Sequence, residues 1–143
     1  MPYYYLEEIG TADIAFEATA RDLPELFTDA ADAMTNVMID NIEAIQPRDT
    51  RVIKLSNDKL DMLLFDFLQE LIFLKDAERL LLRIRDVEID ERNDTYFAKA
   101  TAEGEPLDSE RHQQRADVKA VTLHDFCVEQ AESGWKARVL LDI

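Results

Sequence analysis

Two segments of the chain carry apolar residues at the spacing of amphipathic helices. The first begins near Asp22, because Asp22 and Glu25 have the spacing of a helix capping box. The second can be capped by Asn57 or Asp58, and from Leu60 onward its apolar residues recur at positions i, i+3, i+4, i+7 and i+8. Further apolar residues widen this second pattern, so we expect the second helix to be buried on more than one side.

The other apolar positions follow the two-residue period that is typical of β-strands. The predicted strands cover residues 3–9, 14–19, 79–90, 95–103, 117–129 and 135–143, and an extended stretch covers residues 42–56. Asn93-Asp94 and Ser133-Gly134 mark tight turns between neighbouring strands. Residues 104–116 are polar and are expected to form a loop.

This order of elements predicts an α+β fold, since the helices come early and the strands come late. We expect one mostly antiparallel or mixed sheet with the two helices packed on one face. The chain has 143 residues with 3 Gly and 4 Pro, and it shows neither a repeat nor a low-complexity tract. Residues 1–143 are therefore predicted to form a single domain.

The charge balance limits the partners that the protein can have. Acidic residues outnumber basic residues by 31 to 16, which gives a formal net charge of −15. Nucleic-acid affinity comes largely from Lys and Arg that neutralise phosphates, so we expect no direct binding to nucleic acid and none to anionic membranes. Cations and basic protein surfaces are the favoured partners. The acidic composition can also be explained by solubility alone or by a halotolerant host. A function must therefore be inferred from the positions of the carboxylates.

The expected location is the cytoplasm. No apolar run approaches the roughly 18–20 residues that a membrane-spanning helix needs. The first residues lack the basic and apolar regions of a secretory signal. Cys127 is the single cysteine, so no internal disulfide can form, which fits a reducing compartment.

Three oxygen-bearing groups near the two ends of the chain are candidates for a metal site. Asp13 opens a predicted strand, and Asp142 adjoins the carboxylate of Ile143. Two adjacent anions at the end of an ordered strand repel each other unless a cation offsets them or the strand end frays. Ca²⁺ takes roughly 6–8 oxygen ligands, part of which these groups could supply. The spacing does not show that Asp13 and Asp142 meet, and a solvated acid is the simplest interpretation of each.

Several other polar residues allow both a structural and a functional interpretation. Asp66 and Glu70 lie four residues apart on the second helix, either as a carboxylate pair or as part of a solvated face. His112 lies in the polar loop, where contacts with a partner are common. His124 alternates with Phe126 along a predicted strand, so we expect it to be packed or hydrogen-bonded. No metalloprotease, P-loop, dinucleotide or nucleophile-elbow motif occurs, so no catalytic residue is assigned.

Four segments, in order along the chain, resemble motifs of the archease family. The segment from Gly10 to Ile14 resembles the His-Thr-Ala-Asp signature, and Leu63–Leu71 looks like the central helix of the family. Val118–His124 resembles the Val-Lys-Ala-Val-Thr-Tyr-His strand, and Val139–Ile143 resembles the terminal Asp-Ile ending. Because these motifs span nearly the whole chain in register, the sequence is identified as a member of that family.

The resemblance implies an accessory protein and not an enzyme. Archeases stimulate an RtcB-type tRNA-splicing RNA ligase by promoting guanylylation of its active-site histidine and so multiple turnover. The resemblance also implies a divalent cation, with Ca²⁺ the first choice and Mg²⁺ or Mn²⁺ as alternatives. The family ligands match Asp13, Asp142 and the Ile143 carboxylate here.

Further candidates for partner contact, or for contacts around the metal site, are Asp66, His112, Lys119 and His124.

Two positions depart from the family pattern, and two other function classes stay open. Gly10 stands where the family has His, and Leu123 stands where it has an aromatic residue. If that imidazole orients the site, its loss weakens metal binding or alters the partner chemistry. The alternatives are a metal-dependent hydrolase that uses the same carboxylates and a general chaperone or assembly factor. The sequence does not specify the native ion, the docking face, the physiological RNA or the oligomeric state.

Overall fold

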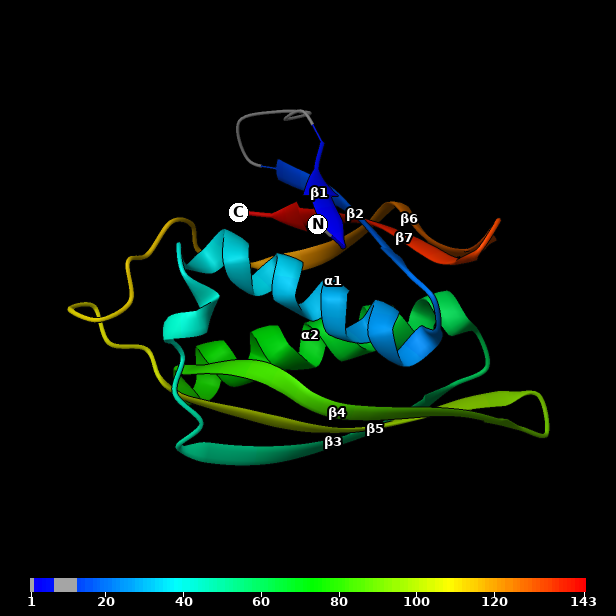
Figure 1. Ribbon diagram of the computed structural model, residues 1–143, viewed down its shortest axis with the longest axis horizontal. Coiled ribbons are helices and arrows are strands. Elements are labelled where there is room, and N and C mark those ends of the chain that lie inside the picture. The colour runs from blue at the N-terminus through cyan, green and yellow to red at the C-terminus, as the bar shows by residue number, and fades with distance from the viewer. Residues whose placement is uncertain (1, 7–12) are drawn as a thin grey trace.

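Within residues 2–6 and 13–143, which the computed structural model describes, seven strands form two antiparallel sheets with both helices between them (Figure 1). The first sheet has the strand order β1-β2-β7-β6, and the second has the order β3-β5-β4. The elements are β1 (Tyr3–Tyr5), β2 (Asp13–Ala20), α1 (Leu23–Met38), a short 3₁₀ helix (Ile42–Ala44), β3 (Asp49–Asn57), α2 (Leu60–Glu78), β4 (Leu80–Arg92), β5 (Thr95–Pro106), β6 (Ala120–Ala131) and β7 (Gly134–Asp142).

The α+β class is confirmed, but the expected single sheet is wrong. The strands divide into two sheets because both helices are apolar on more than one side and need a sheet on each side. Phe27 of α1 and Phe67 of α2 are fully buried, with ring centroids 5.3 Å apart. Burying such a side chain contributes roughly 1.5–3 kcal/mol, so the contact between the helices adds substantially to stability. Neither helix in the described ranges is long and apolar enough to span a bilayer.

The two helices start in different ways. The carboxylate of Asp22 caps α1 and accepts a hydrogen bond from the backbone N–H of Glu25 at 2.9 Å, as predicted. The predicted cap of α2 is wrong, because the N-cap residue is Lys59, which makes no side-chain capping bond. Asn57 instead accepts a hydrogen bond from the N–H of Lys59 at 3.0 Å. Its side chain therefore shapes the turn before the helix and leaves the helix end itself uncapped.

Strand β6 is irregular in its middle, which changes the position of His124. Its pairing with β7 shifts register between Thr122 and Cys127, and Asp125 has a left-handed backbone with φ of 56°. The alternation expected from Phe126 is therefore broken: Phe126 is buried while His124 is exposed. The expectation of a packed His124 is wrong, because an irregularity in a strand re-aims the side chains on either side of it.

Candidate metal centre

Asp13 and Asp142 lie directly opposite each other at one end of the two central strands of the first sheet. Asp13 opens β2, Asp142 closes β7, and the two residues are register partners in an antiparallel pair. Directly opposed residues point to the same face of a sheet, with Cβ atoms about 4.5–5.5 Å apart. The structure thus brings together two carboxylates that lie at opposite ends of the sequence.

The start of β6 adjoins the same place. Ala120 is the register partner of Asp142 on the other side of β7, and the backbone N–H of Lys119 donates to the carbonyl oxygen of Asp142 at 2.8 Å. Three strand ends therefore meet at the carboxylate pair. One step along the same face, Ala15 and Leu140 are buried, so the pair lies beside an apolar surface.

The carboxylates farther along this face differ from the pair, because they have cationic or hydroxyl partners. Glu17 lies 3.8 Å from the guanidinium of Arg138 and also accepts a hydrogen bond from the hydroxyl of Tyr4. Within residues 2–6 and 13–143, no ion pair involves Asp13 or Asp142. Two like charges placed opposite each other repel, so this is the point of the face where a cation is most stabilising.

The donors at the site are oxygen atoms. Carboxylate and carbonyl oxygens suit Ca²⁺, Mg²⁺ and Mn²⁺ and suit Zn²⁺ less well. Among the described residues, no group of three or more His, Cys, Asp and Glu side chains is placed to hold a metal ion. Asp13 and Asp142 can therefore form only part of a coordination shell. The carboxylate of Ile143, backbone carbonyls and water would have to supply the remaining ligands.

Helix α2 fixes the segment that leads into β6. The ammonium of Lys75 donates to the carbonyl oxygen of Val118 at 2.9 Å and pairs with Asp117 at 2.6 Å. Gln69 accepts a hydrogen bond from the backbone N–H of Val121 at 2.8 Å. Because Lys119 lies between these two anchors, α2 positions the backbone that contacts Asp142. This role of Lys75 could not be predicted from the sequence, since it depends on a contact across more than forty residues.

His112 lies away from the carboxylate pair in a buried network. It is 1% exposed, and its Nδ1 accepts a hydrogen bond from the backbone N–H of Asp108 at 2.9 Å. Its Nε2 lies 2.9 Å from a carboxylate oxygen of Glu105, so Nε2 carries the proton and donates to it. Both ring nitrogens are thus used within the chain, and a direct contact of this side chain with a partner is excluded by its burial.

Glu105 is the acceptor at the centre of that network. It is 2% exposed and also accepts hydrogen bonds from the N–H of Gln46 at 2.9 Å and from Arg111. Burial acts to raise the pKa of Glu105, but the hydrogen bonds from Gln46, His112 and Arg111 outweigh it and lower that pKa below its usual value. Glu105, which no sequence pattern singles out, therefore fixes the loop to β5.

Of the other candidates, His124 and Asp66 have partners of their own, and Lys119 adjoins the pair. The side chain of His124 is exposed, with Nε2 3.4 Å from a carboxylate oxygen of Asp125. Asp66 is partly buried on α2 and accepts a hydrogen bond from the side-chain amide of Asn57 at 3.1 Å. Lys119 is exposed and adjoins the pair through its backbone. Gly10, where the sequence departs from the family pattern, lies outside the described residues.

Comparisons with known proteins match this chain over nearly its whole length. The sequence model of the archease protein family (MTH1598/TM1083) matches residues 3–143. The chain is 39% identical over 142 residues to a protein archease of Methanosarcina acetivorans, covering 99% of this chain and 95% of that protein. It is 35% identical over 134 residues to a protein archease of Pyrococcus abyssi, covering 93% and 94%.

Two solved structures share the fold. The solution structure of Methanobacterium thermoautotrophicum protein 1598 has a TM-score of 0.85 and 35% identity, covering 99% of each chain. A crystal structure of an archease from Thermotoga maritima, described as a possible chaperone, has a TM-score of 0.56 and 17% identity, covering 98% of each chain. The second likeness shows the fold alone.

Proposed function

This chain belongs to the archease family, and on that premise we propose that it is a metal-binding activator of an RtcB-type tRNA-splicing RNA ligase. In this role it promotes guanylylation of the ligase and multiple turnover, and it catalyses no reaction itself. The observation that carries the proposal is the register pairing of Asp13 with Asp142 at the end of the first sheet. These are the two positions that match the metal ligands of the family.

The geometry supports a cation site in two ways. The two carboxylates point to one face from adjacent strands whose backbones are held by hydrogen bonds, so little entropy is lost when they bind an ion. A bound cation would also offset the mutual repulsion of these two carboxylates, which lie next to the buried Ala15 and Leu140. Ca²⁺ fits the oxygen donors, and Mg²⁺ or Mn²⁺ uses the same groups with more bound water.

The charge of the whole protein supports a protein partner. A net charge of −15 repels RNA and favours association with a basic surface, such as one that binds RNA or nucleotide phosphates. We propose that the end of the sheet bearing Asp13 and Asp142 docks near the nucleotide site of the ligase. A divalent ion held there would offset phosphate charge during guanylylation. Asp13 and Asp142 hold that charge in place, while Lys119 adjoins the pair at the docking edge.

Two rival functions make different predictions. A metal-dependent hydrolase that uses the same carboxylates would turn over substrate without any ligase. A general chaperone would bind many unfolded partners, and the Thermotoga maritima relative is described as a possible chaperone. The large apolar side chains exposed in the described residues come from different elements, namely Tyr4 and Tyr5 in β1, Val52 in β3, Phe73 in α2 and Leu123 in β6. We therefore favour one specific partner.

The test is single-turnover guanylylation of the ligase with the wild-type protein and with Asp13→Asn. Asp86→Asn is the matched control, since Asp86 is an exposed residue of β4 and its substitution removes the same charge from the other sheet. We expect the wild type and Asp86→Asn to accelerate guanylylation and Asp13→Asn to lose most of that effect. Equal rates with all three proteins would contradict the role of the carboxylate pair.

A binding measurement separates the metal site from the partner. Titration calorimetry with CaCl₂ is expected to show one site in the wild type and in Asp86→Asn, and none in Asp13→Asn. A chain extended beyond Ile143 tests the third carboxylate, because the extension converts it into an amide, and we expect weaker calcium binding. Calcium binding without any effect on the ligase would refute the activator role while leaving the metal site in place.

A further inference from the structure

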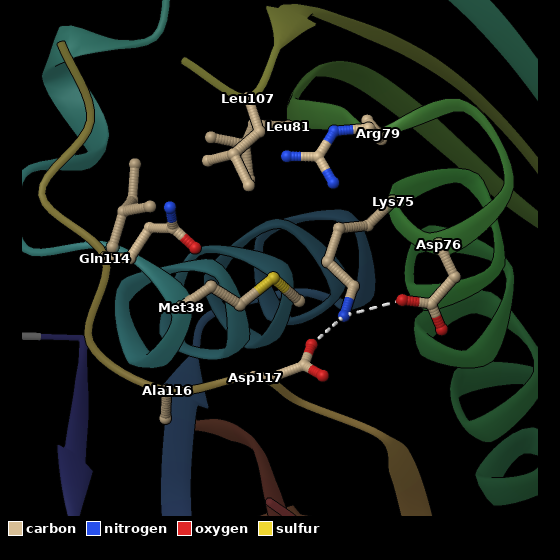
Figure 2. A pocket seen from close by; sticks show the side chains of 10 residues that line it. Met38, Lys75, Asp76, Arg79, Leu81, Leu107, Gln114, Ala116 and Asp117 are labelled. Atoms are coloured by element: carbon tan, nitrogen blue, oxygen red, sulfur yellow. Dashed lines mark hydrogen bonds and ion pairs between the residues drawn. The ribbon is translucent and has the colours of Figure 1, made fainter. Parts of the chain in front are cut away.

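A cavity of about 360 Å³ lies between the C-terminal ends of the two helices, the start of β4 and the segment that leads into β6 (Figure 2). This volume falls within the range of small-ligand pockets, which is roughly 300–1,000 Å³. Met38, Leu81 and Leu107 give the cavity an apolar surface, while Arg79 and Gln114 line it with polar groups. The cavity is distinct from the pair formed by Asp13 and Asp142.

Arg79 is the unusual residue of this cavity. It closes α2 in the left-handed conformation, with φ of 56° and ψ of 30°, where glycine is the ordinary choice. Its backbone N–H donates to the carbonyl of Leu74, and its own carbonyl accepts a hydrogen bond from Leu107 at 2.7 Å. Figure 2 shows its guanidinium extending across the cavity toward Leu81. Arg79 is exposed at the mouth of the cavity, and a non-glycine residue kept at a strained backbone position there points to a role for its guanidinium.

The second cation of the cavity is already neutralised. The ammonium of Lys75 lies 2.8 Å from Asp76 and 2.6 Å from Asp117, and both contacts are drawn in Figure 2. Arg79, in contrast, takes part in no ion pair within residues 2–6 and 13–143. The guanidinium of Arg79 is therefore the positive group that the cavity offers to a ligand.

We propose that this cavity binds a small organic carboxylate. A guanidinium can hold a carboxylate with two parallel hydrogen bonds, and the apolar body of the ligand would cover Met38, Leu81 and Leu107. The amide of Gln114 on the opposite side supplies one donor and one acceptor for a further polar group.

The charges around the cavity select the type of anion. Asp76 and Asp117 lie on the same rim, and the whole chain carries a net charge of −15. These negative charges repel a ligand with two negative charges more strongly than a ligand with one. A carboxylate is therefore favoured over a phosphate monoester. A free organic acid and the C-terminal residue of an apolar peptide share this chemistry, and the experiment distinguishes them.

The test is an NMR titration of the full chain, labelled with ¹⁵N, with sodium 4-methylpentanoate as the probe. We expect saturable shifts of the backbone amides of Arg79, Leu107 and Gln114 with a Kd on the order of 1 mM. The neutral analogue 4-methylpentanamide should bind about 10–100-fold more weakly, because a charge-assisted hydrogen bond is lost. Acetyl-Gly-Gly-Leu tests the peptide source, and tighter binding of that peptide assigns the cavity to a chain end.

Two variants of Arg79 separate binding from folding. Arg79→Gly suits the left-handed backbone, so its melting temperature should equal or exceed that of the wild type while the probe no longer binds. Arg79→Lys keeps the charge without the two-pronged geometry and should bind more weakly than the wild type. Arg92→Gln is the matched control, since Arg92 lies over the ring of Phe97 at 4.2 Å, away from the cavity. Equal binding of acid and amide, or unchanged binding by folded Arg79→Gly, would overturn the proposal.

Discussion

Replacement of Asp29 by Asn should stabilise the protein at neutral pH. Asp29 lies on α1, is only 9% exposed, and its Oδ2 is buried without a hydrogen-bond partner in the described part of the chain. Burial, with a smaller contribution from the charges of Glu25 and Asp32, raises the pKa of Asp29 from 3.8 to about 6. At pH 7 the protein therefore carries an ionised carboxylate in a place that favours the neutral acid.

The size of this effect follows from the raised pKa. A rise from 3.8 to about 6 makes the ionised form about 3 kcal/mol less favourable in the folded state than in the unfolded state. Asn does not ionise, but its amide is also buried without full hydrogen bonding, which costs about 1 kcal/mol or more. We therefore expect Asp29→Asn to raise the free energy of unfolding by about 1–2 kcal/mol at pH 7.

The pH dependence gives the sharper signature. Below the ordinary pKa of 3.8, Asp29 is protonated in the folded and the unfolded state, so it does not lower the free energy of unfolding. Between 3.8 and about 6 the folded state keeps the proton that the unfolded state has lost, so the stability of the wild type falls as pH rises. Above about pH 6 Asp29 is ionised in both states, and the full loss of stability is present. The advantage of Asp29→Asn should therefore be absent near pH 4 and grow until about pH 6.5.

Urea unfolding followed by far-UV circular dichroism at several pH values measures this difference. Asp86→Asn is again the control, because it removes one negative charge from an exposed position and reports the general effect of net charge. A stability difference between wild type and Asp29→Asn that stays constant from about pH 4.5 to about pH 7.5 would refute the reasoning. So would a loss of stability at pH 7.5.

Three further predictions concern polar contacts. Arg83 donates two hydrogen bonds to Asp32, at 3.0 and 3.2 Å; Asp32→Asn removes the charge and one of these two acceptors, and should lower the free energy of unfolding by about 1–2 kcal/mol in urea melts, the opposite of the change expected at its neighbour Asp29. Glu105→Gln should lower the free energy of unfolding by about 2–4 kcal/mol at pH 7. Because the pKa of Glu105 is lowered in the folded state, the wild type loses this advantage as pH falls below about 4.5. The urea midpoints of the wild type and the variant should therefore converge as the pH is lowered further. Lys75→Met should weaken calcium binding in calorimetry, with partial rescue by Lys75→Arg, whereas unchanged affinity would show that the contact with Val118 does not position Asp142.

The local features of the fold could be predicted from the sequence. The stripe and cap of α1, the apolar pattern of α2 and the turn at Asn93-Asp94 all depend on residues close in the chain. The pairing of strands could not be predicted, since β5 lies between β3 and β4, and β2 pairs with the distant β7. An alternating pattern shows that a strand has two faces but does not identify its neighbours.

The same limit explains what could be predicted of the candidate site. The end-to-end pairing of Asp13 with Asp142 was suggested by the family resemblance and is a consequence of strand register, which spacing does not encode. His112 lies in the loop, as predicted, but its burial could not be predicted, because it depends on Glu105 and Arg111 and a polar segment has no pattern that indicates such a network. The exposure of His124 could not be predicted, because the irregular backbone at Asp125 occurs without the glycine that usually marks such a position.

The contacts of α2 with the segment before β6 explain how the pair formed by Asp13 and Asp142 is held. Asp142 lies at the end of β7, where a strand would fray unless neighbouring strands bind it on both sides. Asp13 pairs with it on one side, and the backbone of Lys119 binds it on the other. Lys119 is held in turn because Lys75 and Gln69 of α2 bind the backbone of Val118 and Val121. Helix α2 therefore fixes a strand end at which two negative charges lie opposite each other, an arrangement whose repulsion a bound cation would relieve.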